Sequence, residues 1–128
     1  ASYHLDNIIT VGAHDDHLNK VPSSNWGRET VDIFAPGYKI KSAFPKFRLA
    51  ELTGTSQATA FVTSAVANIL SKTERKLNAS EVRSHLKKLV EPNRMFSSKC
   101  TFGGVLDLDK MNSIKPIKGQ LTFRVSAN

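Results

Sequence analysis

The first half of the chain alternates short apolar runs with polar, turn-rich segments. Apolar, β-branched runs of this length are typical of buried strands in a parallel sheet, whereas polar runs with Pro, Gly and Asn are typical of surface loops. The predicted strands are residues 7–13, 31–35 and 38–42. Residues 14–27 predict a surface excursion, and residues 44–51 predict a mixed connector.

The periodicity changes in the second half of the chain. Residues 56–70 are apolar almost all round and contain no formal charge, which predicts a buried helix. Asn78 and Glu81 have the spacing of a capping box for a second helix, whose apolar positions continue to Val90 before Pro92 ends it. The remaining predicted elements are a short strand at residues 103–108, a last helical piece after it, and a half-buried strand at residues 120–126.

Composition limits the class of protein. The length of 128 residues suits about one domain, and 40% hydrophobic residues are enough to fill a core. One cysteine excludes an internal disulfide framework and a Cys-rich zinc site. The net charge of +7 comes from basic residues spread along the chain, and aromatics are not interleaved with them in a stacking pattern, which indicates a solvated basic surface. We therefore expect no nucleic-acid partner, and, without an apolar run of about 20 residues, no membrane partner.

Ser56 is the candidate nucleophile. It opens the predicted buried helix directly after Gly54 and Thr55. A hydroxyl at this place lies next to the free N–H groups and the positive end of the helix dipole, which can stabilise an oxyanion. Serine is also favoured at helix N-termini for capping alone. Gly-Thr-Ser by itself therefore allows both roles.

The surroundings of Ser56 resemble one family. Residues 52–60 resemble the nucleophile motif G-T-S-x-A of the subtilisin-like serine peptidases. Further segments resemble motifs of that family in the same order and spacing: residues 7–13 (V-I-x-V-G-A), 24–27 (S-N-x-G), 31–37 (x-D-x-x-A-P-G), 81–86 and 103–107. The chain is thereby identified as a member of peptidase family S8 over residues 7–111.

The resemblance implies an α/β fold, namely the C-terminal portion of a subtilisin-like three-layer fold with a mainly parallel sheet. Residues 1–111 would form the C-terminal part of the catalytic domain, and residues 112–128 remain unassigned as a tail or an edge strand. In the family a triad of Asp, His and Ser acts in that order along the chain. Ser56 matches the nucleophile, whereas the positions of the catalytic Asp, the catalytic His and the oxyanion Asn fall before Ala1.

The implied function is that of a serine endopeptidase, a hydrolase that cleaves peptide or protein substrates through an acyl-enzyme at Ser56. Its partner would be the N-terminal part of the same catalytic domain. We expect the chain alone to be inactive and poorly folded, and the parent protein to be secreted or on the cell surface, as most relatives are. The alternative is a non-catalytic, subtilase-derived interaction module, which would have no chemical need for Thr55 and Ser56.

Other polar residues offer weaker signals. The segment from His14 to His17 holds two histidines and two carboxylates, which suits either a divalent metal or a solvated turn, and its loop context favours the turn. The family resemblance implies that Asp32 is structural or lies near a weak cation site, and is not part of the triad, and we expect Cys100 to be an inert thiol. No histidine lies in the family's H-G-T context, so a locally rebuilt triad is not expected. We assign no metal ligand and no certain cofactor, although the resemblance allows a structural calcium ion in the parent protein.

Overall fold

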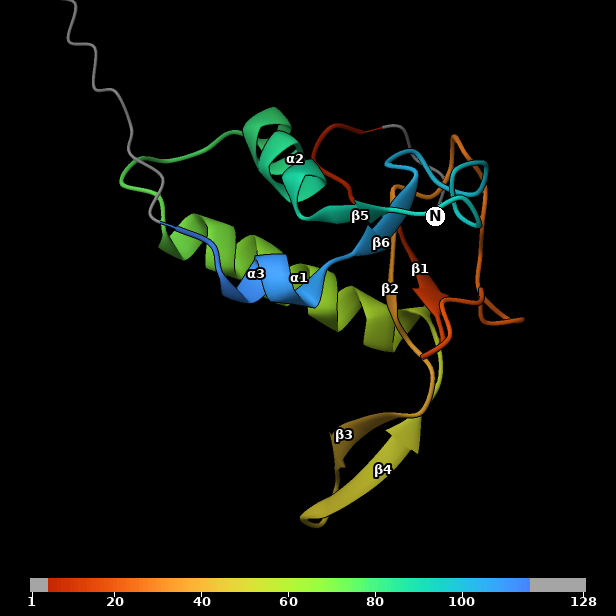
Figure 1. Ribbon diagram of the computed structural model, residues 1–128. Helices are drawn as coiled ribbons and strands as arrows, with labels where there is room; N and C mark the ends of the chain where they lie inside the picture. The colour runs from red at the N-terminus through yellow and green to blue at the C-terminus, as the bar shows by residue number, and fades with distance from the viewer. Residues whose placement is uncertain (1–4, 116–128) are drawn as a thin grey trace, which may run out of the picture.

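The computed structural model describes residues 5–115 (Figure 1). Its strands are β1 (Val11–His14), β2 (Ile33–Pro36), β3 (Ile40–Phe44), β4 (Arg48–Leu52), β5 (Val90–Pro92) and β6 (Gly104–Leu106). Its helices are α1 (Thr55–Ser71), α2 (Ala79–Lys88) and α3 (Leu108–Asn112). The strand predicted at residues 120–126 and most of the unassigned segment 112–128 lie outside the described residues.

Four of the strands form one sheet, in the order β1-β2-β6-β5. The pairs β1–β2 and β2–β6 are parallel, and β5–β6 is antiparallel. In the longest of these registers Val11 lies opposite Ile33 and His14 lies opposite Pro36. The prediction of an α/β fold with a mainly parallel sheet is confirmed.

Both faces of this sheet are buried, as the apolar character of its strands predicts. Alternate residues of β2 point to opposite faces, so Ile33 and Ala35 share one apolar cluster while Phe34 belongs to another. The first cluster includes the buried stripe of α1: Ala58, Val62, Ala65 and Ile69. The second cluster packs Phe34 and Val105 against Phe96 and Cys100. Helix α1 thus covers one face, and the segment before β6 covers the other.

Helix α2 is held by its cap and by an ion pair. The predicted capping box is confirmed, since the Glu81 backbone N–H donates to Asn78 Oδ1 and the Asn78 N–H donates to Glu81 Oε2, both at 2.9 Å. Farther along α2, Arg83 Nη2 lies 2.5 Å from Asp32 Oδ1. The Thr10 backbone N–H donates to Asp32 Oδ2 at 2.8 Å. Asp32 therefore ties α2 to the start of two strands, the structural role expected for it.

Two expected boundaries were wrong. Residues 44–51 are not a mixed connector, because Arg48 to Leu52 form β4 and pair antiparallel with β3. Arg, Leu, Ala and Glu favour helices, so the strand results from its partner rather than from local preference. The second helix also ends at Lys88, because Val90 pairs with Leu106 in the sheet.

Helix α1 differs from the expected fully buried helix. It buries one stripe, while the opposite side exposes mostly small residues and one larger apolar one. The exposed positions include Ala60, Ser64, Ala67 and Leu70. Within residues 5–115, α1 is therefore covered along one side only.

Candidate active site

The N-terminus of α1 lies at the carboxyl ends of β1 and β2 (Figure 1). The Gly37 N–H donates to the His14 carbonyl at 3.0 Å, and the Gly54 N–H donates to the Gly37 carbonyl at 2.8 Å. A Cβ atom at Gly37 would lie 2.5 Å from the Ala13 Cβ and 2.7 Å from the Gly54 carbonyl oxygen. Only glycine permits this close approach. The carboxyl edge of parallel strands is where α/β folds bind ligands.

The hairpin of β3 and β4 fills the gap in sequence between β2 and α1. Its two ends are joined at the base, where the Lys39 backbone N–H donates to Thr53 Oγ1 at 2.9 Å. The chain therefore leaves the sheet edge after Gly37 and returns to it at Gly54. The hairpin therefore ends directly before the first turn of α1.

Ser56 is exposed in the first turn of α1. The N-cap residue of the helix is Gly54, whose φ of 159° and ψ of 173° belong to a region that only glycine readily adopts. Ser56 is therefore not the cap, and within the described residues no side chain caps this helix end. The free N–H groups and the positive dipole end are left open beside the Ser56 hydroxyl.

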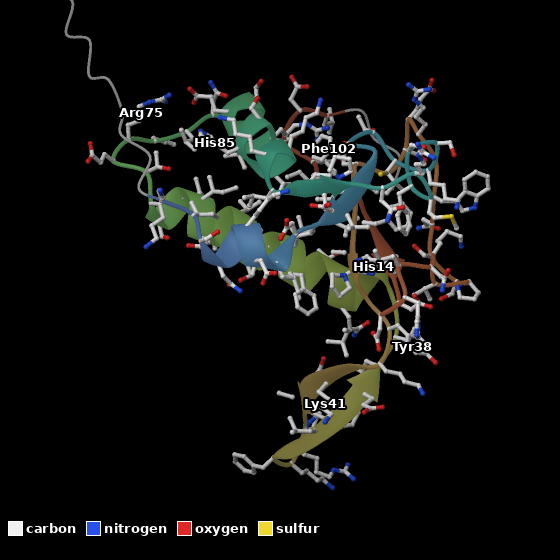
Figure 2. The ribbon with its side chains drawn as sticks, viewed as in Figure 1. His14, Tyr38, Lys41, Arg75, His85 and Phe102 are labelled. Carbon is white, nitrogen blue, oxygen red and sulfur yellow. The ribbon has the colours of Figure 1, made fainter. Side chains whose placement is uncertain are left out.

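The histidines do not gather around Ser56 in the described part of the chain. His14 is 6% exposed, with Nδ1 2.7 Å from the Asp15 carbonyl oxygen and its ring 6.2 Å from that of Phe96. His85 lies on α2 (Figure 2), and His17 is exposed. His4 lies outside the described residues. The sheet thus places His14 on the face opposite α1.

Burial of His14 corrects the expectation of a solvated excursion over residues 14–27. His14 continues the alternation of β1 to the buried face occupied by Phe96, a signal that the polar residues after it obscured. Its Nε2 atom is buried and has no hydrogen-bond partner among residues 5–115. Burial lowers the pKa of His14, and the hydrogen bond with the Asp15 backbone carbonyl and the nearby Asp15 and Asp16 carboxylates oppose this only in part. The neutral imidazole is therefore favoured.

Ser24 is the other buried polar residue of this segment, at 5% exposed. Its Oγ accepts a hydrogen bond from the Ala13 N–H at 2.8 Å and donates to the Asn25 carbonyl at 2.9 Å. It therefore fastens the turn of residues 24–27 to the carboxyl end of β1. The Ser-Asn-x-Gly pattern was the sequence signal for this turn.

The residues after His14, 15–19, form a turn. Asp15 Oδ1 accepts hydrogen bonds from the His17 and Asn19 backbone N–H groups at 2.9 and 2.8 Å. The bond from Asn19 is the main cause of the lowered pKa of Asp15. Across residues 5–115, no three His, Cys, Asp or Glu side chains lie together as a metal site would require.

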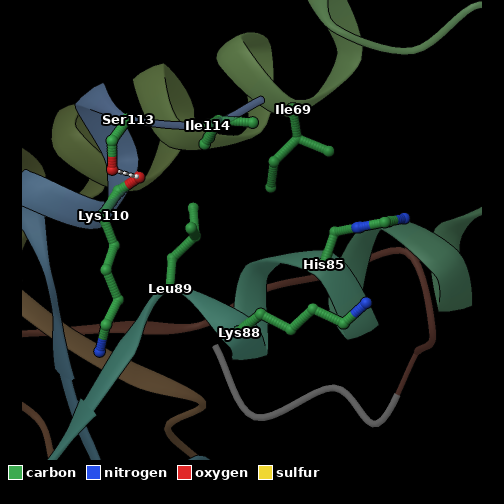
Figure 3. A pocket seen from close by; sticks show the side chains of 7 residues that line it. All are labelled: Ile69, His85, Lys88, Leu89, Lys110, Ser113 and Ile114. Carbon is green, nitrogen blue, oxygen red and sulfur yellow. Dashed lines mark hydrogen bonds between the residues drawn. The ribbon is translucent and has the colours of Figure 1, made fainter. Parts of the chain in front are cut away.

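A hollow of about 260 Å³ lies between α1, α2 and α3 (Figure 3). It has an apolar floor and a basic rim, formed by Ile69, His85, Lys88, Leu89, Lys110, Ser113 and Ile114. Lys110 is already paired with Asp107 at 3.1 Å and Glu91 at 3.2 Å. Ile69 is about 20 Å from Ser56 along α1, given 1.5 Å per residue. The hollow therefore does not belong to the candidate site.

Cys100 is buried on the sheet face opposite α1, 1% exposed. Burial raises the pKa of its thiol, which favours the protonated and unreactive form.

None of the helices within residues 5–115 is both long and apolar enough to cross a bilayer.

Comparison with known proteins identifies the family. The model of the subtilase family matches residues 1–103. Subtilisin DY from Bacillus licheniformis is 41% identical over 81 residues, which cover 63% of this chain and 29% of the relative. The subtilase-type proteinase RRT12 from Saccharomyces cerevisiae is 46% identical over 70 residues, which cover 52% of this chain and 14% of the relative. The chain thus spans less than a third of the length of these relatives.

Similarity to solved structures agrees with the family match. The A-subunit of the AB5 toxin from E. coli has a TM-score of 0.70 at 29% identity, over 82% of this chain and 37% of that chain. The prenylagaramide maturation protease PagA has a TM-score of 0.66 at 32% identity, over 82% of this chain and 41% of that chain. The glycine-closed sheet edge, the open start of α1 and these matches lead to one conclusion: the chain belongs to the subtilase family.

Proposed function

We propose that this chain carries the nucleophile of a subtilisin-like serine endopeptidase, and that Ser56 is that nucleophile. The observation that carries the proposal is the exposed Ser56 on the uncapped first turn of α1, beyond the carboxyl ends of β1 and β2. Ser56 Oγ attacks the peptide carbonyl, and the leaving amine takes the proton that a general base removed from the hydroxyl. Water then hydrolyses the acyl-enzyme ester and restores the serine.

The base and the oxyanion donor come, in this proposal, from the N-terminal part of the same catalytic domain. That part supplies the catalytic Asp and His and the Asn side chain of the oxyanion hole. The engagement of His14 with Asp15 and Phe96 supports a base from elsewhere. The exposed side of α1 supports it too, because its small residues, such as Ala60 and Ala67, suit close packing of another segment. The chain without that segment is inactive.

The proposal extends to domain, substrate and location. Residues 1–111 form the C-terminal part of the catalytic domain in this proposal, and the family match supports the assignment of residues 1–103 to that domain. The substrates are peptides or proteins, and the parent protein is secreted or on the cell surface. A structural calcium ion stays an expectation of the resemblance.

Covalent labelling tests the nucleophile. The intact protein is treated with a fluorophosphonate, and the modified peptide is identified by mass spectrometry. We expect the label on Ser56, and we expect Ser56→Ala to remove it and lower kcat by about 10⁴–10⁶-fold. Ser64→Ala is the matched control, because Ser64 is exposed on the same helix and lies two turns farther along. It is expected to keep both the label and the activity.

Two results would contradict the proposal. One is a Ser56→Ala protein that still reacts with the fluorophosphonate. The other is an intact, folded protein that takes no label and cleaves no peptide, which would favour the non-catalytic interaction module instead.

A further inference from the structure

The β3–β4 hairpin projects from the body of the protein as a separate two-stranded sheet (Figure 1). Its register runs from the Ile40–Leu52 pair at the base to the Phe44–Arg48 pair at the outer end. Ile40 and Leu52 are half-buried, whereas Phe44 and Arg48 are exposed. The outer half of the hairpin therefore has no cover within residues 5–115.

This outer half exposes apolar side chains on both faces and in the turn. Neighbouring pairs of an antiparallel ladder point to opposite faces, so Leu49, paired with Ala43, and Phe44, paired with Arg48, lie on different faces. Phe47 lies in the turn between the strands and is fully exposed, at 110%. Leu49 is 76% exposed and Phe44 45%. A lone hairpin is at best marginally stable in water, and exposed apolar clusters mark interaction sites.

Basic residues surround the apolar tip. Lys46 and Arg48 flank Phe47 in the sequence, and Lys41 follows farther back on β3 (Figure 2). Residues 38–52 carry four basic residues, Lys39 among them, against one carboxylate, and therefore a net charge of +3. That carboxylate, Glu51, lies opposite Lys41 near the base. The tip itself is free of negative charge.

The backbone holds this tip in a disfavoured conformation. Lys46 has a φ of 66° and Phe47 a φ of 57°, values that bulky residues rarely adopt. Positive φ at two successive residues is what tight hairpin turns require. The turn therefore fixes the exposed Phe47 at the outer end of the hairpin.

The distribution of apolar residues on the hairpin distinguishes a bilayer from a protein as its partner. A protein groove covers one face of a hairpin, and an added strand covers one edge. The interfacial layer of a bilayer surrounds an inserted tip on all sides, accepts aromatic rings, and offers phosphates to the cations just behind them. Apolar residues on both faces and at the turn, with Lys46 and Arg48 beside them, fit this layer.

We propose that the β3–β4 hairpin inserts its tip into the surface of an anionic phospholipid bilayer. Phe44, Phe47 and Leu49 enter the boundary between headgroups and acyl chains, while Lys41, Lys46 and Arg48 bind lipid phosphates. This contact holds the protein on a membrane without spanning it, and goes beyond the proposed peptidase activity. It revises the expectation of no membrane partner, because that expectation rested only on the lack of a spanning apolar run.

Vesicle co-sedimentation tests the proposal. The intact protein with Ser56→Ala, to prevent proteolysis, is mixed with vesicles of phosphatidylcholine containing about a third phosphatidylserine, and with vesicles of phosphatidylcholine alone. We expect binding to the anionic vesicles only, weakened by salt. Phe47→Ser should weaken it about tenfold, and the pair Lys46→Glu and Arg48→Glu at least tenfold.

Matched controls separate the hairpin from the overall positive charge. Met95→Ser removes an exposed apolar side chain elsewhere, and the pair Lys72→Glu and Lys76→Glu makes the same charge change beyond α1. Both should bind within about twofold of the parent protein. Circular dichroism confirms that each variant is folded.

Three outcomes would overturn the proposal. The first is the absence of binding to anionic vesicles. The second is an equal loss in the hairpin variants and the Lys72/Lys76 control, which would indicate adsorption through overall charge. The third is a concentration-dependent dimer that Phe47→Ser abolishes together with vesicle binding, which would make the tip a contact between copies. Fluorophosphonate labelling of Ser56 is independent of all three.

Discussion

The four-stranded sheet and the β3–β4 hairpin adjoin each other in the chain but are stabilised in different ways. In the sheet, Phe34 is 0% exposed and packs against Phe96, with ring centroids 4.5 Å apart. In the hairpin, Phe47 has the same side chain and is fully exposed. Both regions have regular strand pairing. The comparison indicates that pairing sets the shape of each region, whereas burial supplies stability only to the sheet.

The candidate nucleophile lies where these two regions meet. Gly37 and Gly54 close the junction from the side of the sheet, and the Lys39–Thr53 hydrogen bond closes it from the side of the hairpin. Ser56 follows within two residues of Gly54. Its position therefore depends on the rigid sheet and helix, while the hairpin tip is free to make other contacts.

The largest effect should come from emptying the sheet core. Phe34→Ala is expected to lower the free energy of unfolding of the intact protein by about 3–5 kcal/mol, because the cavity removes both burial and packing. The measurement is urea denaturation. Phe47→Ala is the matched control and should change that free energy by less than about 0.5 kcal/mol. Equal losses in the two variants would mean that the hairpin tip is as well packed as the sheet.

An added methyl group should destabilise the junction formed by Gly37 and Gly54. Gly37→Ala is expected to cost about 1–3 kcal/mol, because its Cβ meets the Ala13 Cβ and the Gly54 carbonyl oxygen. The displaced Gly54 should also slow fluorophosphonate labelling of Ser56 by up to about 100-fold. Denaturation and labelling rate are measured on the same preparation. An unchanged labelling rate in a destabilised protein would show that the reactivity of Ser56 does not depend on the junction.

The contribution of an ion pair to the free energy of unfolding should increase with its burial. Arg83→Met is expected to cost about 1–3 kcal/mol, because it leaves the half-buried Asp32 carboxylate without its charged partner and frees the Ile8 carbonyl. Arg75→Met is the control, since its pair with Glu81 is more exposed. Its loss in urea denaturation should be clearly smaller than that of Arg83→Met, because solvent screens an exposed pair. A larger loss for Arg75 would contradict the ranking by burial.

The smallest effect should be a pH dependence from His14. Burial lowers the pKa of His14 below its usual 6.5, so the unfolded chain takes up the proton more readily than the folded one. Its contribution is complete above pH 6.5 and is lost as the pH falls below 6.5 toward the lowered pKa. His14→Phe should therefore flatten the fall in melting temperature between pH 7 and pH 5. The exposed His17→Asn is the control and should leave the slope unchanged.

Local signals in the sequence were enough for most of the scaffold. The apolar runs predicted β1 and β2, the change of period predicted α1, and Asn78 with Glu81 predicted the start of α2. These signals lie within a few consecutive residues, where propensity and capping act. The motif around Ser56 is enough to identify the family, and the role of Ser56 itself stays a prediction.

Tertiary structure decided the rest. β4 and β5 form because Arg48 and Val90 meet partners in other segments, which no local pattern encodes. His14 is buried because its strand places it against Phe96, more than 80 residues away in sequence. The exposure of Phe47 follows from a hairpin that projects beyond the sheet. The sequence determined which segments can form strands and helices and where the family motif lies, whereas burial and pairing depend on contacts between distant segments and exist only in the folded chain.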